Sequence, residues 1–224
     1  MQIELSHIET WIFDLDLTLY SPEANIMAQV RDRIALFVEG HFRIGSNEAH
    51  AIRHAYWQKY GTTLAGLMAE HGVDPHKYLD FVHDVDLGKL EPCPHLRAHL
   101  LALPGRKFIF TNADRPYAER VLTARGLEDI FEVIFDIHRM GHLPKPNPAS
   151  YRALCDELAI TPTRALFVED SVCNLPPAKA LGMTTIWVKH EVEADSSDHD
   201  RFIDHQIADV TEWLSSVHSP ERAT

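Results

Sequence analysis

The sequence has few cysteines, little positive charge and no long apolar run. Its three cysteines (Cys93, Cys155 and Cys173) show no Cys-x-x-Cys spacing among 224 residues. This argues against a disulfide framework or a zinc knuckle, and predicts buried free thiols in a reducing compartment. Lysine and arginine number 21 against 33 acidic residues, which gives a net charge of −12. Such a chain lacks the basic surface that nucleic acids or anionic membranes require, so we expect neither as a partner.

No apolar stretch approaches the roughly 18 residues that span a bilayer. Residues 1–7 have neither the basic segment nor the apolar segment of a secretory signal. We therefore expect a cytoplasmic protein. Its length and its 45% hydrophobic content suffice for one large core, or for a core domain with an insert.

Short apolar segments that do not alternate with polar residues recur along the chain, as is typical of strands covered on both faces of a parallel sheet. They are residues 11–14, 107–112, 132–136, 165–169 and 184–188. Helical patterns lie between or after them, at residues 116–125, 149–158, 177–181 and 210–217. This alternation predicts an α/β fold with a doubly wound parallel sheet, a Rossmann-like core.

Residues 20–90 interrupt this alternation with four helical patterns and no strand. The first three patterns stop at Gly40, Gly61 and Gly72, and the fourth begins at Asp74, an N-cap residue followed by proline. A helical insert placed directly after the first strand predicts an all-helical cap domain over the carboxyl edge of the sheet. We expect the core to comprise residues 1–19 and 91–224, and the cap residues 20–90. Within the cap, the helical spacing of Tyr60, Thr62, Leu64 and Met68 predicts core positions.

Polar residues gather where the predicted strands end, which is where open α/β sheets bind ligands. They are Asp14, Asp16, Thr111, Asn112, Glu169 and Asp170, with Lys145 in a loop between two prolines. Clustered carboxylates without histidine or cysteine beside them favour a hard cation such as Mg²⁺. Mg²⁺, a lysine and a hydroxyl are the groups that clamp a phosphoryl group, and one of two neighbouring aspartates could attack phosphorus while the other handles protons.

The segment Asp14-Leu15-Asp16-Leu17-Thr18 resembles the DxDxT signature of the haloacid dehalogenase-like superfamily. Thr111, Lys145 and Glu169-Asp170 match the remaining three motifs of that superfamily in order, so the resemblance covers nearly the whole chain. It implies a Mg²⁺-dependent phosphatase that works through an aspartyl-phosphate.

The resemblance also implies a role for each motif residue. Asp14 would be the nucleophile, and Asp16 the general acid and then the base for the hydrolytic water. Thr111 and Lys145 would clamp the phosphate, with help from Asn112. The implied Mg²⁺ ligands are the Asp14 carboxylate, the Asp16 carbonyl, Asp170 and, directly or through water, Glu169.

Several segments look more specifically like the pyrimidine 5′-nucleotidase branch, which hydrolyses nucleoside monophosphates such as UMP and CMP. They are Asp-Leu-Asp-x-Thr-Leu-Tyr at residues 14–20, residues 60–67, residues 110–114, and Glu169-Asp170-Ser171 with Asn174-Leu175. Leu17 departs from the pattern, because this position is commonly asparagine in the branch, and we expect it to alter local hydrogen bonding. The expected partner is a small phosphorylated metabolite, and the sequence specifies no oligomeric state.

Other functions stay open at this point. The substrate could be another small metabolite, such as a sugar phosphate or phosphoglycolate, or a phosphosugar mutase could return the phosphoryl group to its substrate. A dehalogenase normally lacks the second aspartate, so Asp16 argues against that activity. A binding or regulatory protein on a phosphatase scaffold is disfavoured because all four motifs are intact.

Histidines recur at i, i+4 spacing without the HExxH pattern of a zinc site. The pairs are His50/His54, His95/His99 and His138/His142. We expect them to be structural, and the same holds for the polar pair His83-Asp84. Arg115, just past the second strand, is a weaker candidate for reaching the cleft.

Overall fold

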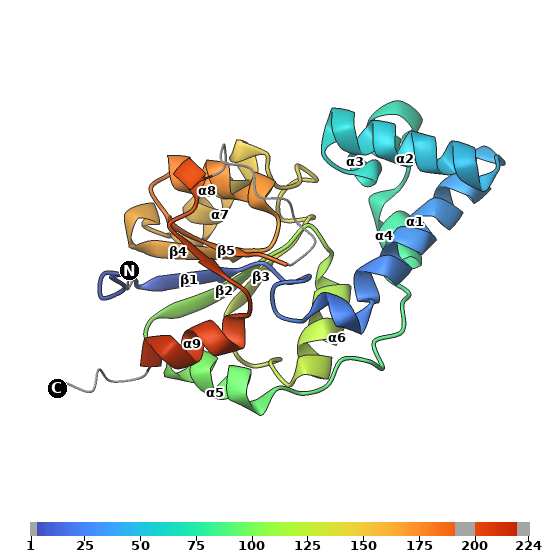
Figure 1. The fold of residues 1–224 in the computed structure, drawn as a ribbon. Helices are drawn as coiled ribbons and strands as arrows, with labels where there is room; N and C mark the ends of the chain where they lie inside the picture. The colour runs from blue at the N-terminus through green and yellow to red at the C-terminus, as the bar shows by residue number, and fades with distance from the viewer. Residues whose placement is uncertain (1–3, 191–199, 219–224) are drawn as a thin grey trace.

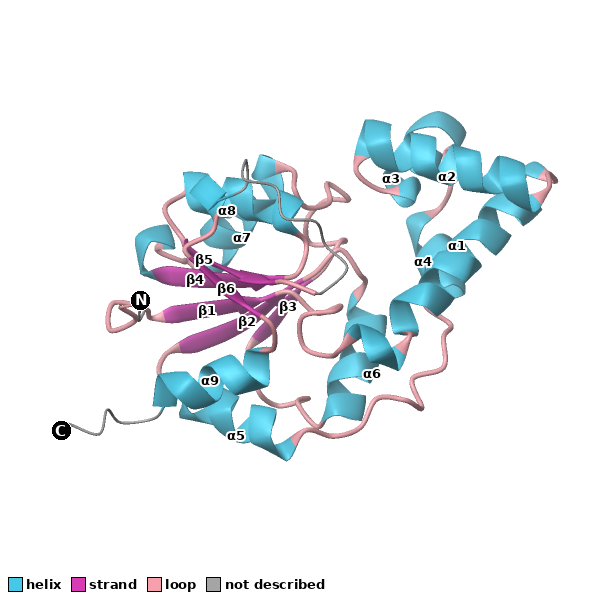
Figure 2. Ribbon diagram, viewed as in Figure 1, coloured by secondary structure: helices cyan, strands magenta, loops and turns pink. Residues whose placement is uncertain are grey.

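The apolar segments form the sheet that the sequence predicts, with one further strand. The structure is a computed structural model that describes residues 4–190 and 200–218. Within these residues the strands are β1 (Thr10–Phe13), β2 (Arg106–Phe110), β3 (Val133–Phe135), β4 (Ala165–Glu169), β5 (Thr184–Val188) and β6 (His205–Ile207). All are parallel, in the order β3-β2-β1-β4-β5-β6 (Figure 2). The prediction of a Rossmann-like α/β fold is therefore confirmed.

The register of the three central strands brings their carboxyl ends to one edge. Phe13 at the end of β1 pairs with Ile109 of β2 and with Val168 of β4. The Asp14 amide continues this ladder by donating to the Val168 carbonyl at 2.9 Å. Residues that follow β1 and β2 therefore meet residues at the end of β4.

Helices cover both faces of the sheet (Figure 1). One face carries α5 (Pro94–Ala102), α6 (Arg115–Arg125) and α9 (Val210–His218), and the other carries α7 (Pro148–Leu158) and α8 (Leu175–Ala180). Short 3-10 turns lie at Pro22–Ala24, Pro162–Arg164, Val172–Asn174 and Asp200–Phe202.

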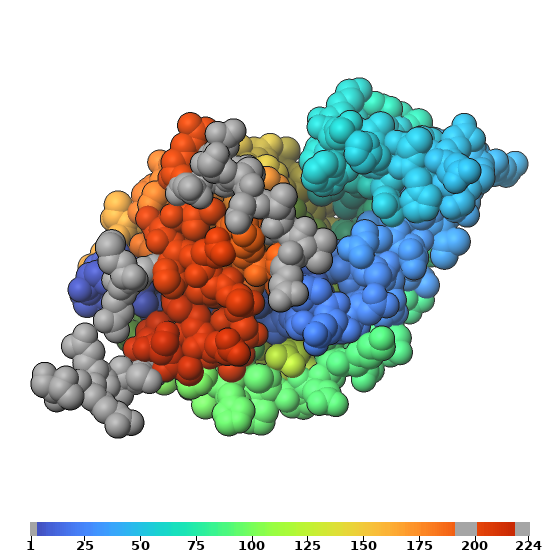
Figure 3. All heavy atoms as spheres, viewed as in Figure 1, coloured from blue at the N-terminus to red at the C-terminus, as the bar shows by residue number. Residues whose placement is uncertain are grey.

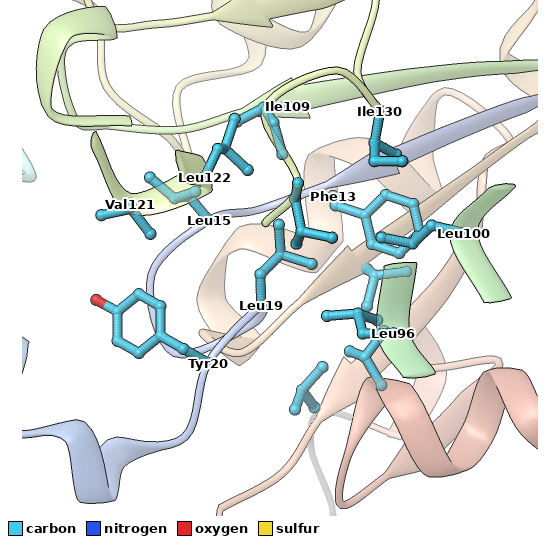
Figure 4. Close-up of a cluster of buried hydrophobic side chains, with 14 of the residues drawn as sticks. Phe13, Leu15, Leu19, Tyr20, Leu96, Leu100, Ile109, Val121, Leu122 and Ile130 are labelled. Carbon is cyan, nitrogen blue, oxygen red and sulfur yellow. The ribbon is translucent and has the colours of Figure 1, made fainter. Parts of the chain in front are cut away.

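Successive residues of β1 point to opposite faces of the sheet, as strand geometry requires. Phe13 packs with Leu96 and Leu100 of α5 and with Leu122 of α6, in the cluster drawn in Figure 4. Ile12 belongs to the apolar cluster on the opposite face. Because both faces are buried, β1 is held rigidly, and it fixes the position of the acidic segment that follows it.

Four helices form an insert between β1 and β2: α1 (Ile26–Phe42), α2 (Ser46–Tyr60), α3 (Thr63–His71) and α4 (Pro75–Val82). We call residues 26–82 the helical insert. In Figures 1 and 3 it stands to one side of the sheet and its flanking helices. Local signals set its helix ends: Gly61 and Gly72 take the left-handed conformation at two C-caps, and Asp74 accepts a hydrogen bond from the His76 amide at 2.9 Å.

Three details differ from the sequence predictions. Helix α1 does not stop at Gly40 but continues to Phe42, whose ring packs 4.7 Å from that of His71; this tertiary contact outweighs the weak helix propensity of glycine. Helix α5 and strand β6 were not predicted. The cysteines are free, but only Cys155 is buried, whereas Cys173 is exposed.

Among the described residues, no helix is long and apolar enough to cross a membrane.

Candidate active site

Asp14 lies at the centre of the carboxyl edge of the sheet and is 6% exposed. Its Oδ1 is 2.6 Å from the ammonium group of Lys145, and its Oδ2 accepts a hydrogen bond from the Thr18 hydroxyl at 3.4 Å. The backbone of β1 fixes the Cα, and Lys145 fixes the carboxylate. Asp14 is therefore held in one orientation.

Lys145 is 2% exposed and uses all three of its donor hydrogens inside the protein. Besides Asp14, its Nζ contacts Oε2 of Glu169 at 2.7 Å and the Phe110 carbonyl at 2.8 Å. Burial alone would lower the pKa of Lys145, but the charges of Asp14 and Glu169 outweigh burial and raise it. The lysine is consequently a fixed positive charge at this edge.

Asn112 holds the loop that carries Lys145. Its Oδ1 accepts from the Lys145 amide at 2.7 Å, and its Nδ2 donates to the Lys145 carbonyl at 3.1 Å. The side-chain amide is therefore occupied by the protein itself. Thr111 is buried beside it, with its hydroxyl oxygen accepting from the Ala113 amide at 3.1 Å.

Carboxylates outnumber cations at this edge. One oxygen from each of Asp14, Glu169 and Asp170 lies within 4.8 Å of the others. Burial raises the pKa of Asp14, and the charge of Glu169 raises it further, although Lys145 opposes both effects. Burial and the charges of Glu169 and Asp14 likewise raise the pKa of Asp170. Such a group stays ionised when a cation joins it, and carboxylate oxygens are ligands that Mg²⁺ accepts.

The hydrogen bonds distinguish these carboxylates as possible metal ligands. Both oxygens of Glu169 are already engaged, one by Lys145 and the other by the Ser171 amide at 3.0 Å. Asp170 is less buried, and its main-chain carbonyl accepts from the Trp187 indole at 2.8 Å, which orients the residue. The residues present therefore fit a hard divalent cation. Asp170 and the Oδ2 of Asp14, whose one hydrogen bond is long at 3.4 Å, are better placed than Glu169 to bind it directly.

Asp16 has surroundings that the sequence did not reveal. Its Oδ1 accepts hydrogen bonds from the hydroxyls of Tyr20, at 2.5 Å, and Tyr117, at 2.7 Å. Burial raises the pKa of Asp16, and the two phenol donors oppose this rise. Tyr20 lies within the segment quoted above for the nucleotidase resemblance, whereas nothing in the sequence singles out Tyr117.

A cavity of about 450 Å³ opens onto Asp16 between the sheet edge and the helical insert. Its walls are mainly apolar, with Met27, Val30, Ile34, Leu64, Tyr78, Leu79, Val82 and Ile137. Its polar lining residues are Arg31, Arg53, His54, Thr62, Thr63, His83 and Asn112 beside Asp16. Thr62 and Leu64, which helical spacing assigned to the core, both line the cavity, and Leu64 is also buried in the apolar core as predicted. The indole of Trp57, 58% exposed, lies at the cavity wall.

Other residues noted in the sequence lie elsewhere. Arg115 pairs with Glu119 at 2.7 Å, and both line a hollow other than the one that contains Asp16. His83 contacts Asp114 rather than its neighbour Asp84, and it lines the cavity. The exposed thiol of Cys173 lies 3.2 Å from the Ser171 hydroxyl and donates to Asn174 Oδ1 at 3.7 Å.

Leu17, the departure from the nucleotidase pattern, has a positive φ of 58°. This left-handed conformation is unfavourable for leucine and tolerated by asparagine, which explains in physical terms why asparagine suits the position. The Leu17 carbonyl is bonded to the His190 ring at 2.8 Å.

The chain is similar in sequence to two known proteins. The chain is 25% identical over 191 residues to Phosphate metabolism protein 8 of Saccharomyces cerevisiae, an alignment that covers 78% of this chain and 60% of the yeast protein. A shorter stretch of 65 residues is 43% identical to the Enolase-phosphatase E1 of Frankia alni, covering 29% of this chain and 27% of that one. The chain thus spans less than two thirds of the length of these relatives.

The fold is shared with a solved haloacid dehalogenase-type phosphatase from Thermococcus onnurineus. The TM-score is 0.60 at 20% identity, over 94% of this chain and 98% of the other. The family model for haloacid dehalogenase-like hydrolases matches residues 8–182, which contain all four motifs. The chain belongs to the haloacid dehalogenase-like hydrolase family.

Proposed function

We propose that the protein is a phosphomonoester hydrolase that works through a phosphoaspartate on Asp14. The observation that carries this proposal is the buried contact between Lys145 Nζ and Asp14 Oδ1, at 2.6 Å. A second aspartate, Asp16, follows Asp14 by two residues. It gives an oriented nucleophile beside a fixed cation, with an acid next to it. Phosphoryl transfer requires these groups, because its transition state depends on positioning and on electrostatic stabilisation.

In the first step, an Asp14 carboxylate oxygen forms a bond to phosphorus while the bond from phosphorus to the ester oxygen breaks. Asp16 gives its proton to the departing oxygen. In the second step, water attacks the phosphoaspartate, its proton passes to Asp16, and inorganic phosphate leaves as the Asp14 carboxylate is restored. In both steps the charge of Lys145, whose hydrogens stay on Asp14, Glu169 and the Phe110 carbonyl, stabilises the transferring oxygens, and the Thr111 hydroxyl donates to one of them.

The residues that would hold Mg²⁺ are Asp14, Asp170 and the Asp16 carbonyl, with Glu169 in direct or water-mediated contact. When bound, the ion would neutralise the excess of carboxylates and the charge on the phosphoryl oxygens. The three carboxylate oxygens of Asp14, Glu169 and Asp170, which lie within 4.8 Å of one another, support this assignment of the metal site.

We assign the helical insert, within residues 20–90, as a cap that excludes water and selects the leaving group. The cavity between insert and sheet supports this assignment, because Asp16 and residues of all four insert helices line it. A nucleoside of a pyrimidine monophosphate is the leaving group we favour. Trp57 and His54 offer ring surfaces to a base, and Arg53 and Thr62 offer hydrogen-bond donors.

Phosphate release with Mg²⁺ tests the proposal. The substrates are UMP, CMP, AMP, GMP, phosphoglycolate and sugar phosphates, and the two variants are Asp14→Asn and, as a matched control, Asp32→Asn on the exposed face of α1. We expect turnover in the wild type and in Asp32→Asn, none in Asp14→Asn, and a preference for UMP and CMP. Turnover concentrated on a sugar phosphate or phosphoglycolate would keep the mechanism and refute the nucleotide assignment. Isomer formation without free phosphate would indicate a mutase.

A further inference from the structure

We propose that Tyr20 and Tyr117 are positioning residues for the general acid, and that they assign the transferable proton to Oδ2 of Asp16. This inference rests on the proposed function, in which Asp16 protonates the leaving group. Neither tyrosine belongs to the four motifs, and they reach Asp16 from different parts of the fold. Tyr20 follows the acidic segment after β1, whereas Tyr117 lies in α6.

Both hydroxyls donate to the same oxygen. Tyr20 and Tyr117 lie 2.5 Å and 2.7 Å from Oδ1 of Asp16, and their own oxygens are 3.5 Å apart. Since each phenol has one hydrogen, Oδ1 receives two donated hydrogens. A proton placed on Oδ1 would point at these donors, so the acidic proton of Asp16 occupies Oδ2. The pair therefore selects which oxygen delivers the proton and stops the carboxyl group from rotating.

The two phenols remain neutral donors. They are 5% and 1% exposed, and burial together with the charge of Asp16 raises the pKa of each well above its ordinary value. Both phenols therefore keep their hydrogens at neutral pH and can donate to Oδ1. Tyr20 also packs among apolar side chains near Leu19 and Val121, as Figure 4 shows, which restricts its ring.

A second set of contacts fixes the ring of Tyr117. The imidazole of His83 stacks on it, with ring centroids 4.3 Å apart and planes inclined by 19°. His83 Nδ1 donates to Asp114 at 2.6 Å, and Arg120 donates to the His83 carbonyl at 2.9 Å. Because His83 directly follows α4, the last helix of the insert, this stack joins the insert to the tyrosine that orients the acid.

The test compares two kinds of leaving group. A p-nitrophenolate departs without a proton, whereas an alkoxide needs one, so only alkyl substrates depend on a correctly aimed Asp16. We would measure kcat/KM, which reports steps up to the first transfer, for p-nitrophenyl phosphate and for glycerol phosphate or the best nucleotide. The variants are Tyr20→Phe, Tyr117→Phe and the double variant. The matched control is Tyr151→Phe, which removes a buried hydroxyl bonded to the Asn174 carbonyl instead.

We expect each single variant to lower kcat/KM for the alkyl substrate by on the order of tenfold, and the double variant by up to a hundredfold. In the same variants, kcat/KM for p-nitrophenyl phosphate should change by less than about threefold. In Tyr151→Phe, the ratio of kcat/KM for the alkyl substrate to kcat/KM for p-nitrophenyl phosphate should not change. Equal losses on both substrates would reduce the tyrosines to structural residues and overturn the inference, as would no loss on either. A wild type that hydrolyses neither substrate would overturn the proposed function, and the inference with it.

Discussion

Lys145 and Asp14 form an ion pair that is almost closed to solvent, with side chains that are 1% and 8% exposed. The same ammonium group pairs with Glu169, whose side chain is 1% exposed. Two buried carboxylates thus depend on one cation. Removing one partner of a buried pair leaves the other charge uncompensated, and this costs more than the pair itself contributes.

Replacing Lys145 should therefore destabilise the folded protein as well as slow the reaction. We expect Lys145→Met to lower the free energy of unfolding by about 3–5 kcal/mol. Urea denaturation in the presence of a chelator would measure this loss, because a divalent cation would otherwise replace the lost charge. The double variant Lys145→Met, Glu169→Gln should recover part of the loss, since it removes one of the uncompensated carboxylates. A single variant as stable as the wild type would contradict this account.

Mg²⁺ binding should be visible without turnover. A ligand that binds only the folded state raises its stability, so the melting temperature should rise with Mg²⁺ concentration. Asp170→Asn should lose most of this rise, because it removes one of the three clustered carboxylates. Asp32→Asn, which removes an equal charge from exposed α1, should keep it. An identical rise in both variants would place the ion elsewhere.

Gly66 in α3 is required by packing rather than by backbone conformation. A methyl group there would come within 2.7 Å of the Cβ of Tyr56, near the root of that side chain, where it cannot swing away. Gly66→Ala should thus cost about 1–3 kcal/mol. Gly40→Ala is the matched change, since Gly40 lies in α1 with nothing within 4 Å of the added carbon, and it should gain up to about 1 kcal/mol. Chemical denaturation of both variants decides this, and equal effects would refute the packing argument.

His142 should make the protein less stable in mild acid. Burial lowers its pKa, as do the neighbouring rings of His138 and His76, while Asp136 opposes them. The folded state therefore binds this proton less readily than the unfolded state. The contribution of neutral His142 to the free energy of unfolding is therefore complete above the ordinary histidine pKa of about 6.5. It is lost as the pH falls through the lowered pKa of the folded state.

Between pH 7.5 and pH 5.5, we expect the melting temperature of His142→Asn to fall by less than that of the wild type. Asparagine suits the replacement because His142 has a positive φ of 60°. The melting temperature of the control variant His50→Asn, which changes an exposed residue of α2, should fall by as much as that of the wild type. Parallel curves for all three proteins would rule out His142 as the group responsible.

The sequence predicted the sheet and the motif residues because both follow from local patterns. Asp14, Thr111 and Glu169 lie at the ends of unbroken apolar strands, and parallel strands bring such ends together. Strand β6 was missed because only one of its three residues, Ile207, is apolar, whereas the equally short β3 consists of Val133, Ile134 and Phe135.

The environment of Asp16 could not be predicted in this way. Tyr117 lies 101 residues from Asp16 along the chain, and His83 lies 31 residues from Asp114. These contacts exist only because α6 and the end of the insert pack together beside the sheet edge. The local sequence around Tyr117 describes an ordinary buried helix position, and only the fold directs its hydroxyl to the acid.

The most direct test of the phosphoaspartate on Asp14 is a rapid-mixing measurement on Asp16→Asn with p-nitrophenyl phosphate and Mg²⁺. The leaving group needs no proton, whereas the attacking water needs a base, so the first step should survive and the second should stall. We expect a burst of about one equivalent of p-nitrophenolate per protein, with phosphate bound covalently to Asp14. The additional change Asp14→Asn should abolish the burst. A burst that persists in Asp14→Asn, or phosphate bound to another residue, would contradict the central claim.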